Sequence, residues 1–136
     1  RAQRVSRLAG MLAAALEAER PEQPGRFADR LGIRREGAIV FVRLDEVDWI
    51  EAADYCVRVH AGGRIHLLRE PLRELEARLE PDRFVRIHRS AIVNLARVRE
   101  LQAHFHGDGV VVMQDGSRLR VSRARRARLH RLLGLA

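Results

Sequence analysis

Short strand-like segments separated by tight-turn dipeptides constrain this chain more than any other feature. Residues 31–35 and 38–43 flank Glu36-Gly37, and residues 64–69 directly follow Gly62-Gly63. Glycine there allows the positive backbone φ of two-residue hairpin turns, so each dipeptide predicts an antiparallel strand pair. Further strands are expected at 47–53, 55–61, 98–105, 110–114 and 118–121, and another begins at Phe84. The pattern predicts a mainly β fold.

Two short helices interrupt the predicted strands. The first lies between Pro71 and Pro81, carries leucines on one face, and sets Glu74 and Arg78 four residues apart for an ion pair. The second covers about residues 123–133, with Ser122 as its N-cap. The predicted domain is therefore α+β, with most of its residues in strands.

The first 25 residues have a different pattern. Apolar residues recur at helical spacing over 5–19, and the Pro/Gly cluster 21–25 ends that helix. We therefore expect an N-terminal helix followed by a Pro/Gly linker at 1–25, and a separate domain at 26–136. The helix is either a dimerising or signal-transmitting element, or the last helix of a preceding domain.

Charge is distributed unevenly along the chain. Residues 1–82 hold 14 Arg against 15 Asp and Glu, a net charge of −1, whereas residues 83–136 hold 12 Arg against 3 acids, a net charge of +9. Basic faces usually bind nucleic acid or anionic membranes. The chain has a single cysteine and no apolar run long enough to span a membrane. These features predict a cytoplasmic protein with no membrane partner.

The segment 83–94, with the sequence RFVRIHRSAIVN, places basic residues at the end of a strand. Period-two alternation sets Val85 and Ile87 on one face and Arg86 and His88 on the other. We expect Ser90 to cap a short helical turn that runs through residue 93. Free backbone N–H groups of such a turn would face a phosphate.

Three motifs in this order resemble the LytTR family of bacterial DNA-binding domains. They are Ile50-Glu-Ala-Ala-Asp-Tyr55, Phe84-Val-Arg-Ile-His-Arg-Ser-Ala-Ile-Val-Asn94 and Asp115-Gly-Ser-Arg-Leu-Arg-Val-Ser-Arg123, and the resemblance covers about residues 30–133. It implies an elongated fold of stacked antiparallel sheets whose loops enter successive major grooves. It also implies the usual role of this family as the output domain of a two-component response regulator.

The resemblance places base or phosphate contacts on Arg89, Ser90 and Arg123. Its third contact falls after the Glu-Ala motif, where Tyr55 or Arg58 is the weaker match. A guanidinium can fork onto guanine O6 and N7, so Arg89 is the expected base reader.

Charge alone adds three arginines to the expected DNA-binding residues: Arg86 and, at the start of the last helix, Arg125 and Arg126. A helix N-terminus carries partial positive charge and repels cations, and a bound phosphate would relieve that repulsion. His88 either bonds a phosphate or holds its loop.

Other polar residues leave alternatives open. Asn94 either pairs with adenine or serves as a structural cap, ending its apolar run in left-handed geometry. His104, His106 and Asp108 resemble a weak metal site, but the sequence lacks a second ligand cluster. We expect no metal, no cofactor and no catalytic activity.

These observations predict a sequence-specific, double-stranded-DNA-binding transcriptional regulator. Two copies are expected side by side on repeated half-sites, and a receiver domain is expected to precede residue 1. The alternative is a ligand-sensing or protein-interaction β domain whose basic face binds an acidic partner.

Overall fold

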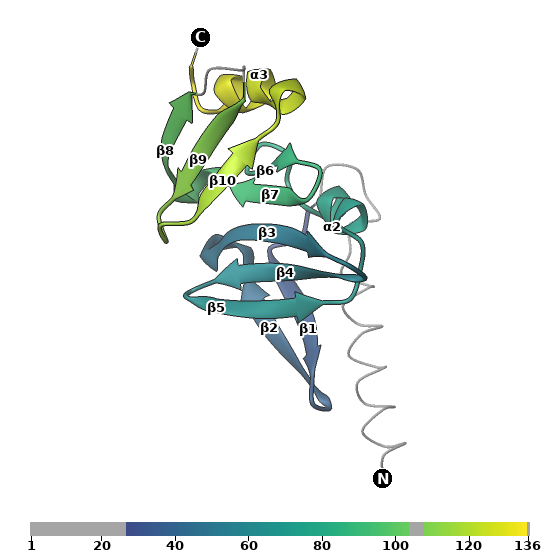
Figure 1. The fold of residues 1–136 in the computed structure, drawn as a ribbon. Helices are drawn as coiled ribbons and strands as arrows, with labels where there is room; N and C mark the ends of the chain where they lie inside the picture. The colour runs from purple at the N-terminus through teal and green to yellow at the C-terminus, as the bar shows by residue number, and fades with distance from the viewer. Residues whose placement is uncertain (1–26, 104–107, 136) are drawn as a thin grey trace.

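The computed structural model describes residues 27–103 and 108–135 as three antiparallel sheets stacked along one axis (Figure 1). The first sheet pairs β1 with β2, the second has the order β5-β4-β3-β7-β6, and the third has the order β10-β9-β8. The strands are β1 (Arg30–Arg35), β2 (Ala38–Arg43), β3 (Val47–Ala53), β4 (Cys56–Ala61), β5 (Arg64–Leu68), β6 (Phe84–His88), β7 (Ala91–Asn94), β8 (Val98–Ala103), β9 (Gly109–Met113) and β10 (Arg118–Val121). The helices are η1 (Leu44–Glu46), α2 (Leu72–Arg78), η2 (Leu95–Arg97) and α3 (Arg123–Leu132). The mainly β prediction with two short helices is confirmed.

The central five-stranded sheet is buried on both faces at β3 and β7, because alternate residues of these two strands enter two different cores. In β3, Ile50 belongs to the first core and its neighbour Trp49 to the second. In β7, Ile92 belongs to the first core and Val93 to the second. Period-two side-chain direction therefore makes one sheet the shared wall of both cores.

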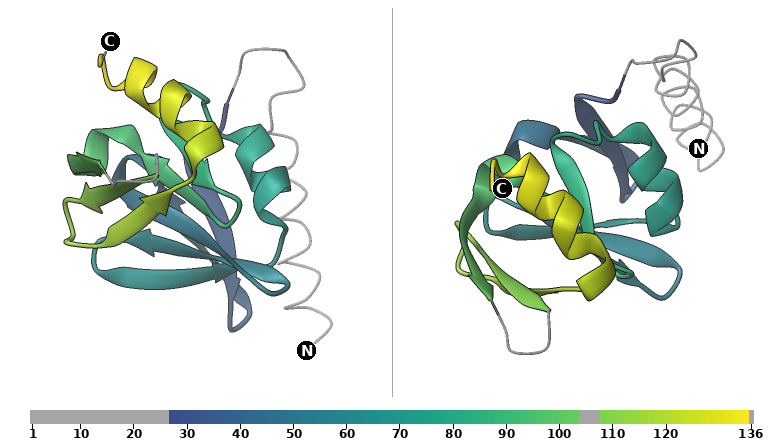
Figure 2. Two further views of the ribbon diagram at one scale, coloured as in Figure 1. Left: turned by 45° about the horizontal axis from the view of Figure 1, so that its top comes forward. Right: turned by 90° about the horizontal axis from the view of Figure 1, so that it is seen from above.

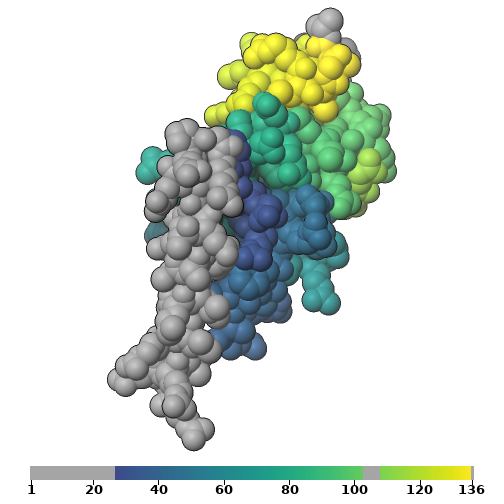
Figure 3. All heavy atoms as spheres, turned by 180° about the vertical axis from the view of Figure 1, so that it is seen from behind, coloured from purple at the N-terminus to yellow at the C-terminus, as the bar shows by residue number. Residues whose placement is uncertain are grey.

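Different elements cover the two faces of this sheet. Residues of β1, β2 and α2 contribute to the first core, and residues of β9, β10 and α3 contribute to the second. Figure 2 shows α3 lying across one end of the stack, and Figure 3 shows the C-terminal elements at that end with β1 and β2 toward the other. The stacked arrangement expected from the sequence is what the structure shows.

The glycine turns have the predicted geometry. Glu36 and Gly37 both have positive φ, as do Gly62 and Gly63. The strand predicted from Tyr55 instead begins at Cys56, and Tyr55 lies in the β3–β4 turn. Asp54 takes positive φ there, which an aspartate tolerates better than most side chains.

Two local expectations are wrong. The segment after Ser90 is strand β7, not a helical turn, because its apolar residues pair with β3 and β6 and fill both cores. The expected Glu74–Arg78 pair is absent from the ion pairs of the described residues, and Arg78 bonds Glu70 instead. That partner lies just before α2, where Arg78 and Glu70 are both half-buried and screened from water.

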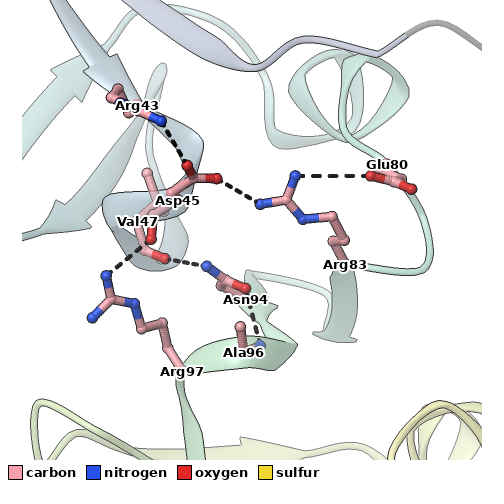
Figure 4. A network of polar contacts seen from close by, with 8 residues as sticks. All are labelled: Arg43, Asp45, Val47, Glu80, Arg83, Asn94, Ala96 and Arg97. Carbon is pink, nitrogen blue, oxygen red and sulfur yellow. Dashed lines mark hydrogen bonds and ion pairs between the residues drawn. The ribbon is translucent and has the colours of Figure 1, made fainter.

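Asn94 is a structural residue. It is only 1% exposed, and its side-chain amide donates to the Val47 carbonyl at 2.8 Å. Its Oδ1 accepts from the Ala96 amide at 3.1 Å, which makes it the N-cap of η2 (Figure 4). The predicted capping role is therefore correct, although its φ of −83° is not left-handed.

A polar network surrounds this cap (Figure 4). Asp45 in η1 accepts hydrogen bonds from Arg43 and Arg83, each at 2.9 Å. These contacts lower the pKa of the Asp45 carboxyl, the bond from Arg83 having the larger effect. Arg97 of η2 donates to the Asp45 carbonyl at 2.9 Å. The network therefore joins the short 3-10 helices η1 and η2, neither of which the sequence pattern predicted.

The expected linker helix at 5–19 and the boundary at residue 25 lie outside the described residues, so the domain division remains a prediction. Within the part of the chain that the structure describes, no helix is long and apolar enough to cross a bilayer.

We predict that Asn94→Ala lowers the free energy of unfolding by about 2–3 kcal/mol, because it leaves the buried Val47 carbonyl without its donor and η2 without its cap. Urea unfolding measures the change. The control is Gln114→Ala, which removes an exposed amide. Equal stability of the two variants would contradict the structural assignment of Asn94.

Candidate nucleic-acid interface

The β3–β4 and β6–β7 turns lie at the same end of the central sheet. Glu51 near the end of β3 pairs with Ala91 at the start of antiparallel β7, so both strands reach their turns at one edge. The Ala52 amide donates to the Ser90 carbonyl at 2.8 Å, which ties the two turns together. The first and second sequence motifs are therefore neighbours in space.

The third motif joins them through the start of α3. The Ser122 amide donates to the Ile87 carbonyl at 2.8 Å, which docks the β10–α3 junction onto β6. Ser122 is the N-cap by position, but its side chain makes no capping bond. Leu129 anchors the helix in the second core, fully buried. The first turn of α3, which carries Arg123, Arg125 and Arg126, is thus held near the β6–β7 turn.

Cations from three elements and one turn lie around His88. Burial lowers the pKa of the imidazole below that of an exposed histidine, and nearby positive charges lower it further. In order of effect, these charges belong to Arg89, Arg120, Arg125 and Arg86. They come from the β6–β7 turn, β10, α3 and β6. This convergence creates a local positive potential suited to an anionic partner.

The β6–β7 turn consists of Arg89 and Ser90. Arg89 is exposed, and its guanidinium makes no hydrogen bond or ion pair to the residues that the structure describes. The Ser90 hydroxyl lies 2.9 Å from His88 Nδ1, and the Ser90 amide donates to the same nitrogen at 3.3 Å. An acceptor role for Nδ1 places the proton of a neutral imidazole on Nε2. His88 therefore holds the turn, which was one of its two expected roles.

Arg86, which we expected at a phosphate, is committed within the protein. Its Nη1 donates to Glu76 Oε1 at 3.0 Å, and its side chain is only 17% exposed. Its Nε donates to the His88 carbonyl at 3.3 Å, and its Nη2 donates to the Arg89 carbonyl. The guanidinium thus spans α2 and the β6–β7 turn rather than facing solvent.

The β3–β4 turn carries the third expected contact. Tyr55 is 94% exposed at its tip, which is unusual for an aromatic side chain in a folded protein. Arg58 lies on β4, half-exposed, with its Nη1 3.5 Å from Glu51 Oε1. Tyr55 therefore projects freely, whereas Arg58 has an acidic neighbour.

The last helix and strand complete the surface. Arg123 is exposed at the first residue of α3, and Arg125 and Arg126 are half-buried in the same turn. Arg120 is a cation that the sequence reasoning missed, and its Nη2 lies 2.9 Å from Asp108 Oδ2. The alternation of β10 could have indicated this exposed cation, because Arg118 and Arg120 share the exposed face and Val121 is buried.

The weak metal candidate cannot be assembled from the described residues. His104 and His106 lie outside them, and Asp108 pairs with Arg120. Among the residues that are described, no group of three or more His, Cys, Asp or Glu side chains has a geometry that would hold a metal ion.

The chain is similar to known proteins in both sequence and fold. Residues 37–134 match the LytTr DNA-binding domain. The fold superposes on the LytTr DNA-binding domain of a putative methyl-accepting/DNA response regulator from Bacillus cereus with a TM-score of 0.71 and 27% identity, covering 79% of this chain and 99% of that one.

Curated relatives extend the comparison. The chain is 36% identical over 118 residues to the CO-responsive transcriptional regulator RcoM of Rhodospirillum rubrum, covering 85% of this chain and 49% of the relative. It is 30% identical over 104 residues to the sensory transduction protein LytT of Bacillus anthracis, covering 76% and 42%. The chain spans about half or less of the length of these relatives. It belongs to the LytTR family and is a DNA-binding domain of the kind found in transcriptional regulators.

Proposed function

We propose that the surface formed by the β3–β4 turn, the β6–β7 turn and the start of α3 binds double-stranded DNA sequence-specifically through successive major grooves. The observation that carries the proposal is the convergence of arginines from three elements around His88, beside an exposed Arg89. Exposed guanidinium groups on rigid turns can both neutralise phosphates and read base edges.

The contacts divide by geometry. Arg89 reads a base, preferably guanine, because its guanidinium is exposed at the tip of a fixed turn. Ser90 and Arg123 contact a base or a phosphate, and Arg125 and Arg126 contact phosphates. In the β3–β4 turn, Tyr55 is the better placed contact because Glu51 restrains Arg58.

His88 and Arg86 play a different part. His88 bonds Ser90 and holds the turn, and Arg86 is engaged by Glu76 and by two backbone carbonyls. We therefore remove Arg86 from the residues proposed to contact DNA.

The domain acts as the output part of a regulator that responds to a signal, and two copies bind repeated half-sites. The names of the relatives support this proposal: one is a CO-responsive regulator and another a sensory transduction protein, and both are longer than this chain. A receiver is the proposed source of the signal. Selection of bound duplexes from a random pool tests specific binding and returns the half-sites and their spacing together. Recovery of unrelated sequences would contradict the proposal and favour an acidic protein partner for the basic surface.

We predict that Arg89→Ala and Arg123→Ala weaken binding to the selected duplex by roughly 5- to 100-fold and weaken binding to random duplex much less. Arg125→Ala should weaken binding to both duplexes by similar factors, because a phosphate contact carries no sequence information. Gel retardation at fixed salt measures both affinities. Arg34→Ala, on β1 beside the β1–β2 turn, removes one exposed cation from another sheet and is the control. Equal losses for all four variants would refute the assigned roles.

We predict that Arg89→Gln raises the pKa of His88 in the free protein, because it removes the largest of the charges that, after burial, lower it. NMR titration of the imidazole measures the shift, and Arg34→Gln should leave it unchanged. The lowered pKa of His88 also makes the free energy of unfolding depend on pH. The unfolded chain takes up the proton first, so this contribution to stability is present above about pH 6.5 and is lost as the pH falls below that value. An unchanged His88 pKa in Arg89→Gln would show that the cations do not converge there.

A further inference from the structure

We propose that Glu76 and Arg86 are positioning residues for DNA recognition, through which helix α2 fixes the β6–β7 turn in the conformation that presents Arg89. The inference rests on the proposed function and deepens it. It gives an acidic side chain beside a basic surface a role in specificity rather than in repelling DNA. Neither side chain needs to contact the duplex.

The backbone of the β6–β7 turn does not favour its own conformation. The described residues contain four two-residue hairpin turns, at 36–37, 54–55, 62–63 and 89–90. The first three each include a residue at positive φ, whereas neither Arg89 nor Ser90 has one. Positive φ is what lets a two-residue turn match the twist of its strands. The Arg89-Ser90 turn must therefore be held by contacts from outside the turn.

Arg86 supplies two of those contacts, beside the His88–Ser90 bonds and the bond from the Ala52 amide to the Ser90 carbonyl. A register shift between Arg86 and His88 forms a bulge just before the turn, and such bulges redirect the following side chains. Arg86 then bonds the His88 and Arg89 carbonyls across this irregularity. A planar fork with several N–H donors can serve two carbonyls and a carboxylate at once.

Glu76 determines where that fork lies. Its carboxylate is 3.0 Å from Arg86 Nη1. Arg86 lies in the group of arginines around His88. The positive charges of the other three arginines repel the Arg86 guanidinium. The carboxylate offsets that repulsion and fixes Arg86 against α2, and α2 is anchored in the first core by Leu72 and Leu75. The position of the turn is thus linked to a packed helix.

A purely electrostatic role of Glu76 and a positioning role predict different effects of Glu76→Gln on DNA binding. If Glu76 acted only through its charge, Glu76→Gln would tighten binding to every duplex by removing a repulsion of phosphates. If Glu76 positions the turn, the same variant loses discrimination between the selected and the random duplex while random binding stays equal or tightens. Glu74→Gln is the matched control, because Glu74 lies on the same helix, is exposed and makes the same charge change.

The experiment measures affinities of the full chain for both duplexes by gel retardation at two salt concentrations. We expect Glu76→Gln to lower the ratio of selected to random affinity roughly tenfold and Glu74→Gln to leave it unchanged. Arg86→Lys keeps the charge but lacks the fork, so it should lower the ratio by a similar factor. The double variant should be no worse than Arg86→Lys alone, because Glu76 acts on the turn only through Arg86.

A second readout does not depend on DNA. NMR order parameters of the Arg89 and Ser90 amides should fall in Glu76→Gln and Arg86→Lys but not in Glu74→Gln, while thermal unfolding stays cooperative in all three. Unchanged discrimination between the two duplexes in Glu76→Gln would overturn the inference. So would a β6–β7 turn that stays ordered in both Glu76→Gln and Arg86→Lys. If the wild-type chain prefers no duplex, the proposed DNA function fails. The order parameters still decide whether the Glu76–Arg86 pair orders the β6–β7 turn.

Discussion

The burial of β7 on both faces is the constraint on which the rest of the structure depends. All four of its residues are buried, and the first three alternate between the two cores. Moving its register by one residue would exchange the contents of both cores, so the pairing of β7 with β3 and β6 is strongly specified. One end of the strand leads from the Arg89-Ser90 turn, and the other end is Asn94, which caps η2. A strand that is buried on both faces therefore sets the position of the proposed DNA-reading turn.

Around this strand, polar contacts perform two tasks. At its end, Asn94 and the Asp45 network join η1, η2 and the segment before β6. At its start, Arg86 links α2 to the turn. Placing several arginines close together is unfavourable in the free protein, and a bound phosphate backbone would relieve that repulsion. The geometry thus holds a positive surface ready for an anion, at a cost that the two hydrophobic cores offset.

Much of this fold could be predicted from the sequence, because its signals are local. Glycine dipeptides gave the hairpins at 36–37 and 62–63, and alternation gave most of the strands. The prediction of a helical turn after Ser90 was wrong, because a short run of apolar residues fits a turn or a doubly buried strand equally well. Pairing with other strands decides between the two. The partners of Arg86 and the place of Arg120 were also missed. Glu76 lies ten residues before Arg86, on a different element, and no periodic pattern connects them.

The decisive measurement is to map the changes in amide chemical shift when the full chain binds its selected duplex, because it locates the contact surface without any substitution. We expect the largest changes at Arg89, Ser90 and the first turn of α3, with smaller changes in the β3–β4 turn. The β1–β2 and β4–β5 turns should not change. Shifts centred on the β1–β2 or β4–β5 turn, or spread evenly over the surface, would show that DNA binds elsewhere than at the proposed surface.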